Sequence, residues 1–270
     1  MQDTQKSYTT AIILALIALI WVSPFSWLAV NAVNPEADGS LSWPNSVGFQ
    51  NFAEAMSGQA GGQFMNSLFL SILTSTLTVI IAVFAAYPLS RLKIPGRNAF
   101  LWALVLLRML PATGVIVPIF FTAKSTGMLN LVGVAIAITM LNLPFTLLLL
   151  KNFFDTVPVE LEEAAYSEGA SFFQIMRNVM LPMSRAGIAV VWFFSFTTAW
   201  NEFLLPLIFV RKTADFPMSV GLFASFGEHS SVNYGFLASY SILYAVPAVA
   251  VYFLLRRNLN TGFAGVGVKG

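Results

Sequence analysis

The sequence predicts an all-α integral membrane protein with six transmembrane helices and both termini in the cytoplasm. Three observations support this prediction: the composition, the spacing of long apolar segments and the placement of the positive charges. Of the 270 residues, 57% are hydrophobic and only 10% are charged, and the mean hydropathy is +0.76. A water-soluble domain typically has about 25% charged residues. A chain with so little polar surface is therefore expected to lie in a lipid bilayer.

Six apolar segments are long enough to cross a bilayer, which takes about 20 helical residues. The expected spans are residues 8–30, 64–89, 99–123, 131–150, 184–210 and 236–255. Turn-forming stretches and a long polar insert separate them. No small-residue cleavage motif follows the N-terminal apolar run, so we interpret that run as a retained span and not as a removed signal peptide. Together the segments predict one transmembrane domain over residues 1–270.

The positive charges indicate how the chain is oriented in the membrane. Three of the 14 Lys and Arg residues fall on one predicted side, Arg108 lies within a span, and ten fall on the other side. Those ten are Lys6, Arg91, Lys93, Arg97, Lys151, Arg177, Arg185, Arg256, Arg257 and Lys269. Cytoplasmic segments are enriched in Lys and Arg. Both termini, the connection at residues 156–182 and the tail at residues 256–270 are therefore expected in the cytoplasm.

The connection at residues 156–182 is a polar, helix-prone run, and it predicts a hairpin of two short helices. Acidic residues fall early in the first helix, where the helix dipole favours negative charge. Gly169 is expected to end that helix or bend it sharply. Ser171 followed by Gln174 has the spacing of a capping box that starts the second helix.

Two interpretations of this hairpin remain open from the pattern alone. The first is an amphipathic linker lying on the lipid headgroups, although such linkers usually carry basic residues on their polar face. The second is a docking element for a cytoplasmic partner. The acidic first helix favours the second interpretation, and Ala164 and Ala165 leave room on it for close approach by another element.

The same hairpin resembles the coupling-loop signature, the EAA motif, of permease subunits of binding-protein-dependent ABC importers. The matching residues are Glu163, Ala164, Ala165, Gly169, Leu181 and Pro182. The longer run Glu160–Ser171 resembles the carbohydrate branch of that family, and in particular the second permease of maltose-type transporters. This chain departs from the branch pattern at Glu168, where Asp is usual, and at Val179, where Ile is common.

Two further motifs support the resemblance. The run AWNEFLLPLIFV, at residues 199–210, is similar to the fifth-span motif of the same subunits. The run FAGVGVKG, at residues 263–270, is similar to their glycine-rich C-terminal tail, although Val-Gly before VKG is a departure. The three motifs occur in the expected order and, with the six spans, cover nearly the whole chain. The resemblance therefore implies the type I ABC importer permease fold.

The resemblance also implies an assembly in the cytoplasmic (inner) membrane of a bacterium or archaeon. A second homologous permease would complete the pore, two ATPase subunits would bind below it, and an extracellular solute-binding protein would deliver cargo. ATP and Mg²⁺ would bind the ATPase subunits, so this chain would carry no cofactor and would not be an enzyme. The cargo would be a di- or oligosaccharide, with a non-sugar solute as the alternative. No nucleic-acid partner is implied.

Specific roles in ATPase coupling follow from the resemblance alone. Glu163 would contact the ATPase surface, Ala164 and Ala165 would sit against its cleft, and Gly169 would permit the turn. The glycine-rich tail would reach the ATPase interface, although a frayed terminus has the same composition. The tail residues concerned are Gly265, Gly267, Lys269 and Gly270.

Four residues in the predicted spans are candidates for the translocation path. Arg108 lies mid-span, where a charge is costly and usually faces a cavity or a partner. Trp200, Asn201 and Glu202 combine an aromatic face with hydrogen-bonding groups, which suits a sugar. The alternatives are structural. Arg108 would pair with another side chain or snorkel to the interface, and Trp200, Asn201 and Glu202 would form hydrogen bonds to the partner permease.

The sequence around these candidates leads to two further predictions. Proline and glycine follow Arg108 closely, so the third span is expected to be bent or locally unwound, as helices that line sites often are. Tyr87 and Asn142 are additional candidates for the path.

Other classes of membrane protein fit the sequence less well. An ion-coupled transporter should show paired intramembrane acids and two related halves, whereas Glu202 is the one acid well inside a predicted span. An intramembrane protease needs a nucleophile and a base within the membrane, but the single histidine, His229, falls in a predicted external loop. The absence of Cys excludes zinc-thiolate sites, disulfides and thiol catalysis. No GxxxxGK[ST] loop is present for ATP.

Overall fold

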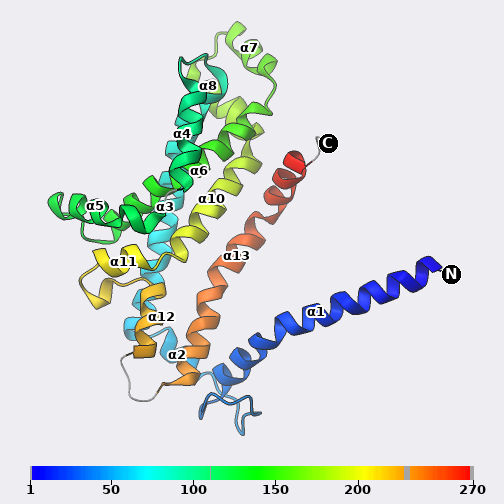
Figure 1. Ribbon diagram of the computed structural model, residues 1–270, viewed down its shortest axis with the longest axis vertical. Coiled ribbons are helices and arrows are strands. Elements are labelled where there is room, and N and C mark those ends of the chain that lie inside the picture. The colour runs from blue at the N-terminus through cyan, green and yellow to red at the C-terminus, as the bar shows by residue number, and fades with distance from the viewer. Residues whose placement is uncertain (1, 110, 228–231, 268–270) are drawn as a thin grey trace. The chain divides into compact units, whose positions relative to one another are not determined.

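The computed structural model describes residues 2–109, 111–227 and 232–267, and its regular structure within these ranges is helical (Figure 1). The helices are α1 (Gln2–Val33), α2 (Gln50–Ala55), α3 (Gly58–Arg91), α4 (Arg97–Met109), α5 (Ala112–Ser125), α6 (Leu131–Asp155), α7 (Val159–Ser167), α8 (Phe172–Ile175), α9 (Leu181–Met183), α10 (Arg185–Trp200), α11 (Leu204–Phe209), α12 (Met218–Gly227) and α13 (Tyr234–Gly267). A π-helical turn, Met176–Met180, joins α8 to α9, and a 3₁₀ turn, Thr213–Asp215, precedes α12. The predicted all-α class is confirmed.

Four helices are long and apolar enough to cross a bilayer by themselves. These segments are Thr10–Val33, Gly58–Arg91, Leu131–Asp155 and Tyr234–Asn258. They contain nearly all of the first, second, fourth and sixth spans expected from the sequence. Two bent pairs of shorter helices raise the number of candidate spans to six.

The third expected span, residues 99–123, is formed by one of these bent pairs. Helix α4 ends at Met109, α5 begins at Ala112 with Pro111 as its N-cap, and the two axes differ by 99°. Proline lacks the backbone N–H that a continuing helix needs. The bend that the sequence predicted after Arg108 is therefore confirmed.

The fifth expected span, residues 184–210, is not the single helix that the sequence suggested. Helix α10 ends at Trp200 and a separate short helix, α11, begins at Leu204. The carboxylate of Glu202 accepts hydrogen bonds from the N–H groups of Leu204 and Leu205, both at 3.1 Å. A side-chain acceptor at this position satisfies donors that the first turn of a helix leaves free. The apolar pattern continues through the break, so hydropathy alone does not reveal that the helix ends there.

Spatial contacts group the chain into two compact units, which are described separately. The first consists of Met1–Phe64 with Gly221–Val246, and the second of Met65–Val220 with Pro247–Gly270. The long helices α3 and α13 each contribute to both units. The single domain expected over residues 1–270 therefore stays a prediction.

Buried polar side chains hold the first unit together. The amide of Asn51 donates to the carbonyl oxygens of Ala32 (3.2 Å) and Asn34 (2.8 Å). The hydroxyl of Tyr240 donates to Oε1 of Gln63 at 2.7 Å. These bonds satisfy polar groups that would otherwise be costly to remove from water.

Helix α6 lies at the centre of the second unit, where it contacts α4, α5, α10 and α11. One apolar core, formed around Leu150, Phe154 and Val191, includes buried residues from the connection after α6. Gly187 of α10 approaches α6 so closely that a Cβ there would lie 2.3 Å from Cγ of Phe153. Small residues permit such close helix pairs within membranes. At one end of this unit, α7 and α8 lie side by side (Figure 1).

Candidate functional site

The segment at residues 156–182, called the hairpin from here on, turns at Gly169. The Gly169 N–H donates to the Tyr166 carbonyl (2.9 Å) and the Ala170 N–H to the Ala165 carbonyl (3.0 Å). This pair of bonds is the Schellman arrangement that ends a helix with a left-handed residue. The φ angle of Gly169 is +83°, which L side chains rarely adopt. The expectation that Gly169 ends the first helix is confirmed.

The second half of the hairpin starts at a capping box. Oε1 of Gln174 accepts the Ser171 N–H at 2.7 Å, as the sequence spacing predicted. The chain then passes through the π-helical turn into α9, which opens with Leu181 and Pro182. Leu181 is half-buried and packs against the core, whereas Pro182 is exposed.

The motif residues of α7 lie on its accessible side. Glu163 and Ala164 are exposed, and Ala165 is half-buried. Large apolar side chains are exposed near them, with Leu161 at 44% and Phe173 at 70% exposure. An apolar surface with acidic neighbours on a polar helix is typical of a protein-docking element.

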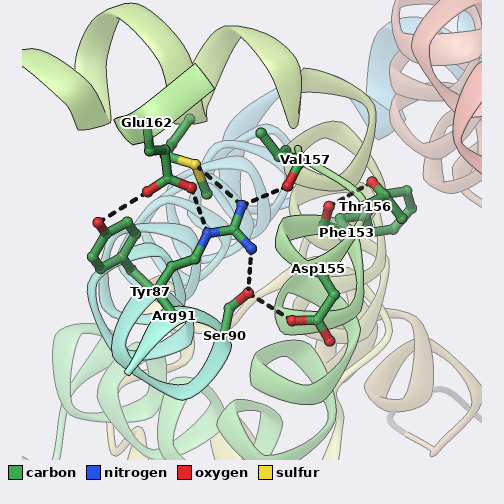
Figure 2. Close-up of polar contacts among 9 residues, drawn as sticks. Tyr87, Ser90, Arg91, Phe153, Asp155, Thr156, Val157 and Glu162 are labelled. Carbon is green, nitrogen blue, oxygen red and sulfur yellow. Dashed lines mark hydrogen bonds and ion pairs between the residues drawn. The ribbon is translucent and has the colours of Figure 1, made fainter. Parts of the chain in front are cut away.

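The buried side of α7 carries Glu162, which the sequence analysis did not select as a site residue. Its carboxylate accepts a hydrogen bond from the Tyr87 hydroxyl at 3.0 Å and forms an ion pair with Nε of Arg91 (Figure 2). The guanidinium of Arg91 also donates to the Val157 carbonyl at 2.8 Å and to Oγ of Ser90 at 3.2 Å. Tyr87, expected as a path candidate, lies at the hairpin instead. The sequence did contain a signal for this residue. Glu162 and Glu163 are adjacent acids, and the EAA motif accounts only for Glu163.

A cavity of about 250 Å³ lies among α4, α5, α6 and α10. Its polar lining residues are Arg108, Asn142, Thr198 and Glu202. The guanidinium of Arg108 lies over the Phe145 ring, 5.4 Å from its centroid. Asn142 is 6% exposed, and within the part of the chain that the structure describes its Nδ2 has no hydrogen-bond partner. The structure therefore brings together two of the four path candidates, Arg108 and Glu202, with the additional candidate Asn142. Thr198 is a polar neighbour that the sequence analysis did not select.

The other two path candidates have different surroundings. Trp200 is 1% exposed and stacks on Phe196, with ring centroids 5.8 Å apart, and Phe196 in turn stacks on Trp192 at 5.3 Å. Side chains four residues apart meet on a helix, so the spacing of these three aromatics was a signal for a packed column. Asn201 is exposed, and its Nδ2 donates to the Thr197 carbonyl at 2.8 Å.

The glycine-rich tail differs from the flexible segment suggested by its composition. Helix α13 continues through Gly265 to Gly267. A single helical glycine costs only about 1 kcal/mol relative to alanine, and adding residues to an existing helix is favourable. Lys269 and Gly270 lie outside the described residues, and the ATPase contact of the tail stays a prediction. Within the described chain, no group of three or more His, Cys, Asp or Glu side chains is placed to hold a metal ion.

Comparisons with known proteins agree with these features. Residues 78–260 match the model of the family described as "binding-protein-dependent transport system inner membrane component". The inner membrane ABC transporter permease protein YcjP of Escherichia coli K12 is 33% identical over 77% of this chain and 74% of its own. The diacetylchitobiose uptake system permease protein DasC of Streptomyces coelicolor is 30% identical over 97% of this chain and 95% of its own.

A solved structure has the same fold. It is described as a bacterial ABC transporter involved in the import of the acidic polysaccharide alginate, and one of its chains matches with a TM-score of 0.83 at 19% identity. The match covers 96% of this chain and 98% of that one. Family model, relatives and fold agree: this chain belongs to the binding-protein-dependent transport system inner membrane component family, and it is a multi-pass permease subunit of an ABC importer, not itself an enzyme.

Proposed function

We propose that this permease imports a di- or oligosaccharide and forms half of a pore that a second homologous permease completes. Two ATPase subunits, which bind ATP and Mg²⁺, dock on its cytoplasmic side, and an extracellular solute-binding protein delivers cargo to the opposite side. The observation that carries this proposal is the hairpin, which exposes Glu163 and Ala164 of the EAA motif while its second half is buried in the apolar core. The name of DasC, a disaccharide uptake permease, supports the class of cargo.

The hairpin has the properties that mechanical coupling requires. Its accessible side offers Glu163 as a charged contact and Ala164 as a site of close approach, while Ile175 and Met180 anchor its second half in the apolar core. When ATP binding closes the ATPase dimer, the hairpin follows the surface on which it is docked. The spans then change from an inward-facing to an outward-facing arrangement. No covalent step takes place in this chain.

The cavity beside Arg108 supports a sugar path along this chain. Glu202 offers a hydrogen-bond acceptor, Asn142 a buried donor and Thr198 a hydroxyl, and these groups match the hydroxyls of a saccharide. At about 250 Å³ the cavity contacts one part of a saccharide and does not enclose an oligosaccharide. A wall supplied by the partner permease would complete the enclosure.

The proposal is tested with the complete importer in proteoliposomes. Binding protein loaded in turn with mono-, di- and oligosaccharides, and with amino acids as controls, is added while ATP hydrolysis and uptake are measured. We expect a di- or oligosaccharide to stimulate both activities. Stimulation by an amino acid and by no sugar would contradict the carbohydrate assignment and leave the ABC importer assignment intact.

A further inference from the structure

The base of the hairpin contains a buried charge pair that the EAA motif does not explain. Glu163 is the acid of the motif, yet its neighbour Glu162 is only 3% exposed. The side chain of Glu162 points from α7 toward the last turn of α3, where Tyr87 and Arg91 meet it (Figure 2). A buried carboxylate is retained only where paired or hydrogen-bonded groups compensate its lost hydration.

Arg91 connects three segments through one guanidinium group. Its Nε pairs with Glu162 of α7, its Nη2 donates to the carbonyl of Val157 in the link between α6 and α7, and its Nη1 donates to Ser90 of α3. The side chains of Arg91 and Glu162 are 10% and 4% exposed. Charges this far from water attract each other strongly, and separating them would leave each without compensation.

The network continues from Arg91 to the end of α6. Oγ of Ser90 donates to Oδ1 of Asp155 at 2.6 Å (Figure 2). Asp155 also forms an ion pair with Lys151 one turn earlier. The last turns of α3 and α6 are therefore joined to each other as well as to α7.

An aromatic contact joins the second helix of the hairpin to the same turn of α3. The rings of Tyr87 and Phe172 meet edge to face, with centroids 5.1 Å apart. Tyr87 thus contacts α8 through its ring and α7 through its hydroxyl. Both helices of the hairpin are fixed to the end of α3.

We propose that Arg91 and Glu162 form a strut that stays closed throughout the transport cycle and passes each displacement of the hairpin directly to α3. Both are positioning residues, because they contact the hairpin and do not line the cavity beside Arg108. The inference rests on the proposed coupling of the hairpin to an ATPase. It adds the route by which that motion enters the membrane.

Distance measurements test the strut without knowledge of the cargo. The chain contains no cysteine, so spin labels can be placed at Ser167→Cys on α7 and Phe84→Cys on α3, both exposed positions. In the complete importer, a non-hydrolysable ATP analogue with Mg²⁺ should leave this distance unchanged. In the same experiment, the distance from Ser167→Cys to its counterpart on the partner permease should change. A control with Arg91→Gln should show a broadened or nucleotide-dependent Ser167–Phe84 distance.

The outcomes separate the strut from the function on which it rests. A nucleotide-dependent Ser167–Phe84 distance in the otherwise unchanged chain would overturn the strut and leave hairpin coupling intact. If nucleotide moved neither distance, the coupling role itself would fail, and the strut with it.

Covalent rescue supplies a second, functional readout. The double variant Arg91→Cys/Glu162→Cys removes the pair, and we expect at least a tenfold fall in cargo imported per ATP hydrolysed. Treating the purified complex with a short bifunctional thiol reagent should restore most of that ratio, whereas a monofunctional reagent should not. A role confined to stability would lower transport and ATP hydrolysis together and leave their ratio unchanged. If the bridged complex imported no cargo while the unbridged variant still did, the pair would have to open during the cycle, and the proposal would be overturned.

Discussion

Glu202 accepts hydrogen bonds from the first backbone N–H groups of α11, including that of Leu205 at 3.1 Å, while its side chain also borders the cavity beside Arg108. One carboxylate therefore has a structural and a proposed functional role. Substitutions at Glu202 that keep or remove the hydrogen-bond acceptor distinguish these two roles.

The first prediction separates those roles. Glu202→Ala removes the acceptor and should lower the free energy of unfolding by about 1 kcal/mol, as expected for loss of a helix cap. Glu202→Gln keeps an acceptor and should stay near the parent stability. Thermal unfolding of the purified complex measures both. If uptake falls in Glu202→Gln at unchanged stability, the charge itself serves transport; equal loss of stability in both variants would contradict the capping role.

The second prediction concerns the accessible acid of the hairpin. Glu163→Ala should leave the complex assembled but reduce the stimulation of ATP hydrolysis by loaded binding protein, because it removes a charged contact to the ATPase. Glu160→Ala is the matched control, since this residue is also an exposed acid of α7 and lies outside the EAA run. Normal coupling in Glu163→Ala, or an equal defect in both variants, would argue against the assigned role. The double variant Glu163→Ala/Gly169→Pro should abolish uptake.

Several features could be predicted from sequence because a local signal determined them. Apolar length located four spans, Gly169 marked a helix end, and Ser171 with Gln174 marked a helix start. Each depends on residues within one or two turns of each other. The bend after Arg108 belongs to the same group, since Pro111 blocks a continuous helix by its own chemistry.

Other features depended on partners far apart in the chain. Glu162 and Arg91 are separated by 71 residues, so no local pattern indicated that they form a pair. Trp200 was one candidate for the translocation path, and in the structure its surface is covered by neighbours that include Phe196. The break at Glu202 was missed because hydropathy does not report which acceptor satisfies a backbone N–H. Pairing and burial within the tertiary structure decided these cases.

The third prediction tests the backbone of the hairpin turn. Gly169→Ala should lower the free energy of unfolding by about 1–2 kcal/mol, because an L-residue is strained at positive φ. Nothing lies within 4 Å of the position that a Cβ would occupy, so the cost comes from the backbone and not from a clash. Gly169→Asn should cost less, since Asn visits this region more readily. Equal effects of Ala and Asn in thermal unfolding would point to another cause.

The fourth prediction concerns the contact between α6 and α10. Gly187→Ala places a methyl group where Cγ of Phe153 would be 2.3 Å away, so the Phe153 side chain or the two helices must shift. Overpacking of this kind typically costs about 1–3 kcal/mol. In a chain that already carries Phe153→Ala, the same Gly187→Ala change should cost less, because the obstructing ring is removed. If Gly187→Ala cost as much in the Phe153→Ala background as in the parent chain, the close approach would not explain the loss.

The fifth prediction distinguishes the stability of the buried pair from its use in coupling. Arg91→Leu leaves Glu162 charged and buried, and Glu162→Leu leaves Arg91 in the same position, so each should cost about 3–5 kcal/mol. The double variant should be more stable than either single variant, because no unpaired charge remains and apolar side chains fill the space. Thermal unfolding of the four proteins gives the interaction free energy of the pair as a double-mutant cycle. Additive losses would show that the two side chains do not interact. If the double variant regains stability but still hydrolyses ATP without importing cargo, the pair contributes to coupling beyond its contribution to folding, since an apolar contact lacks the directional bonds that hold α7 to α3.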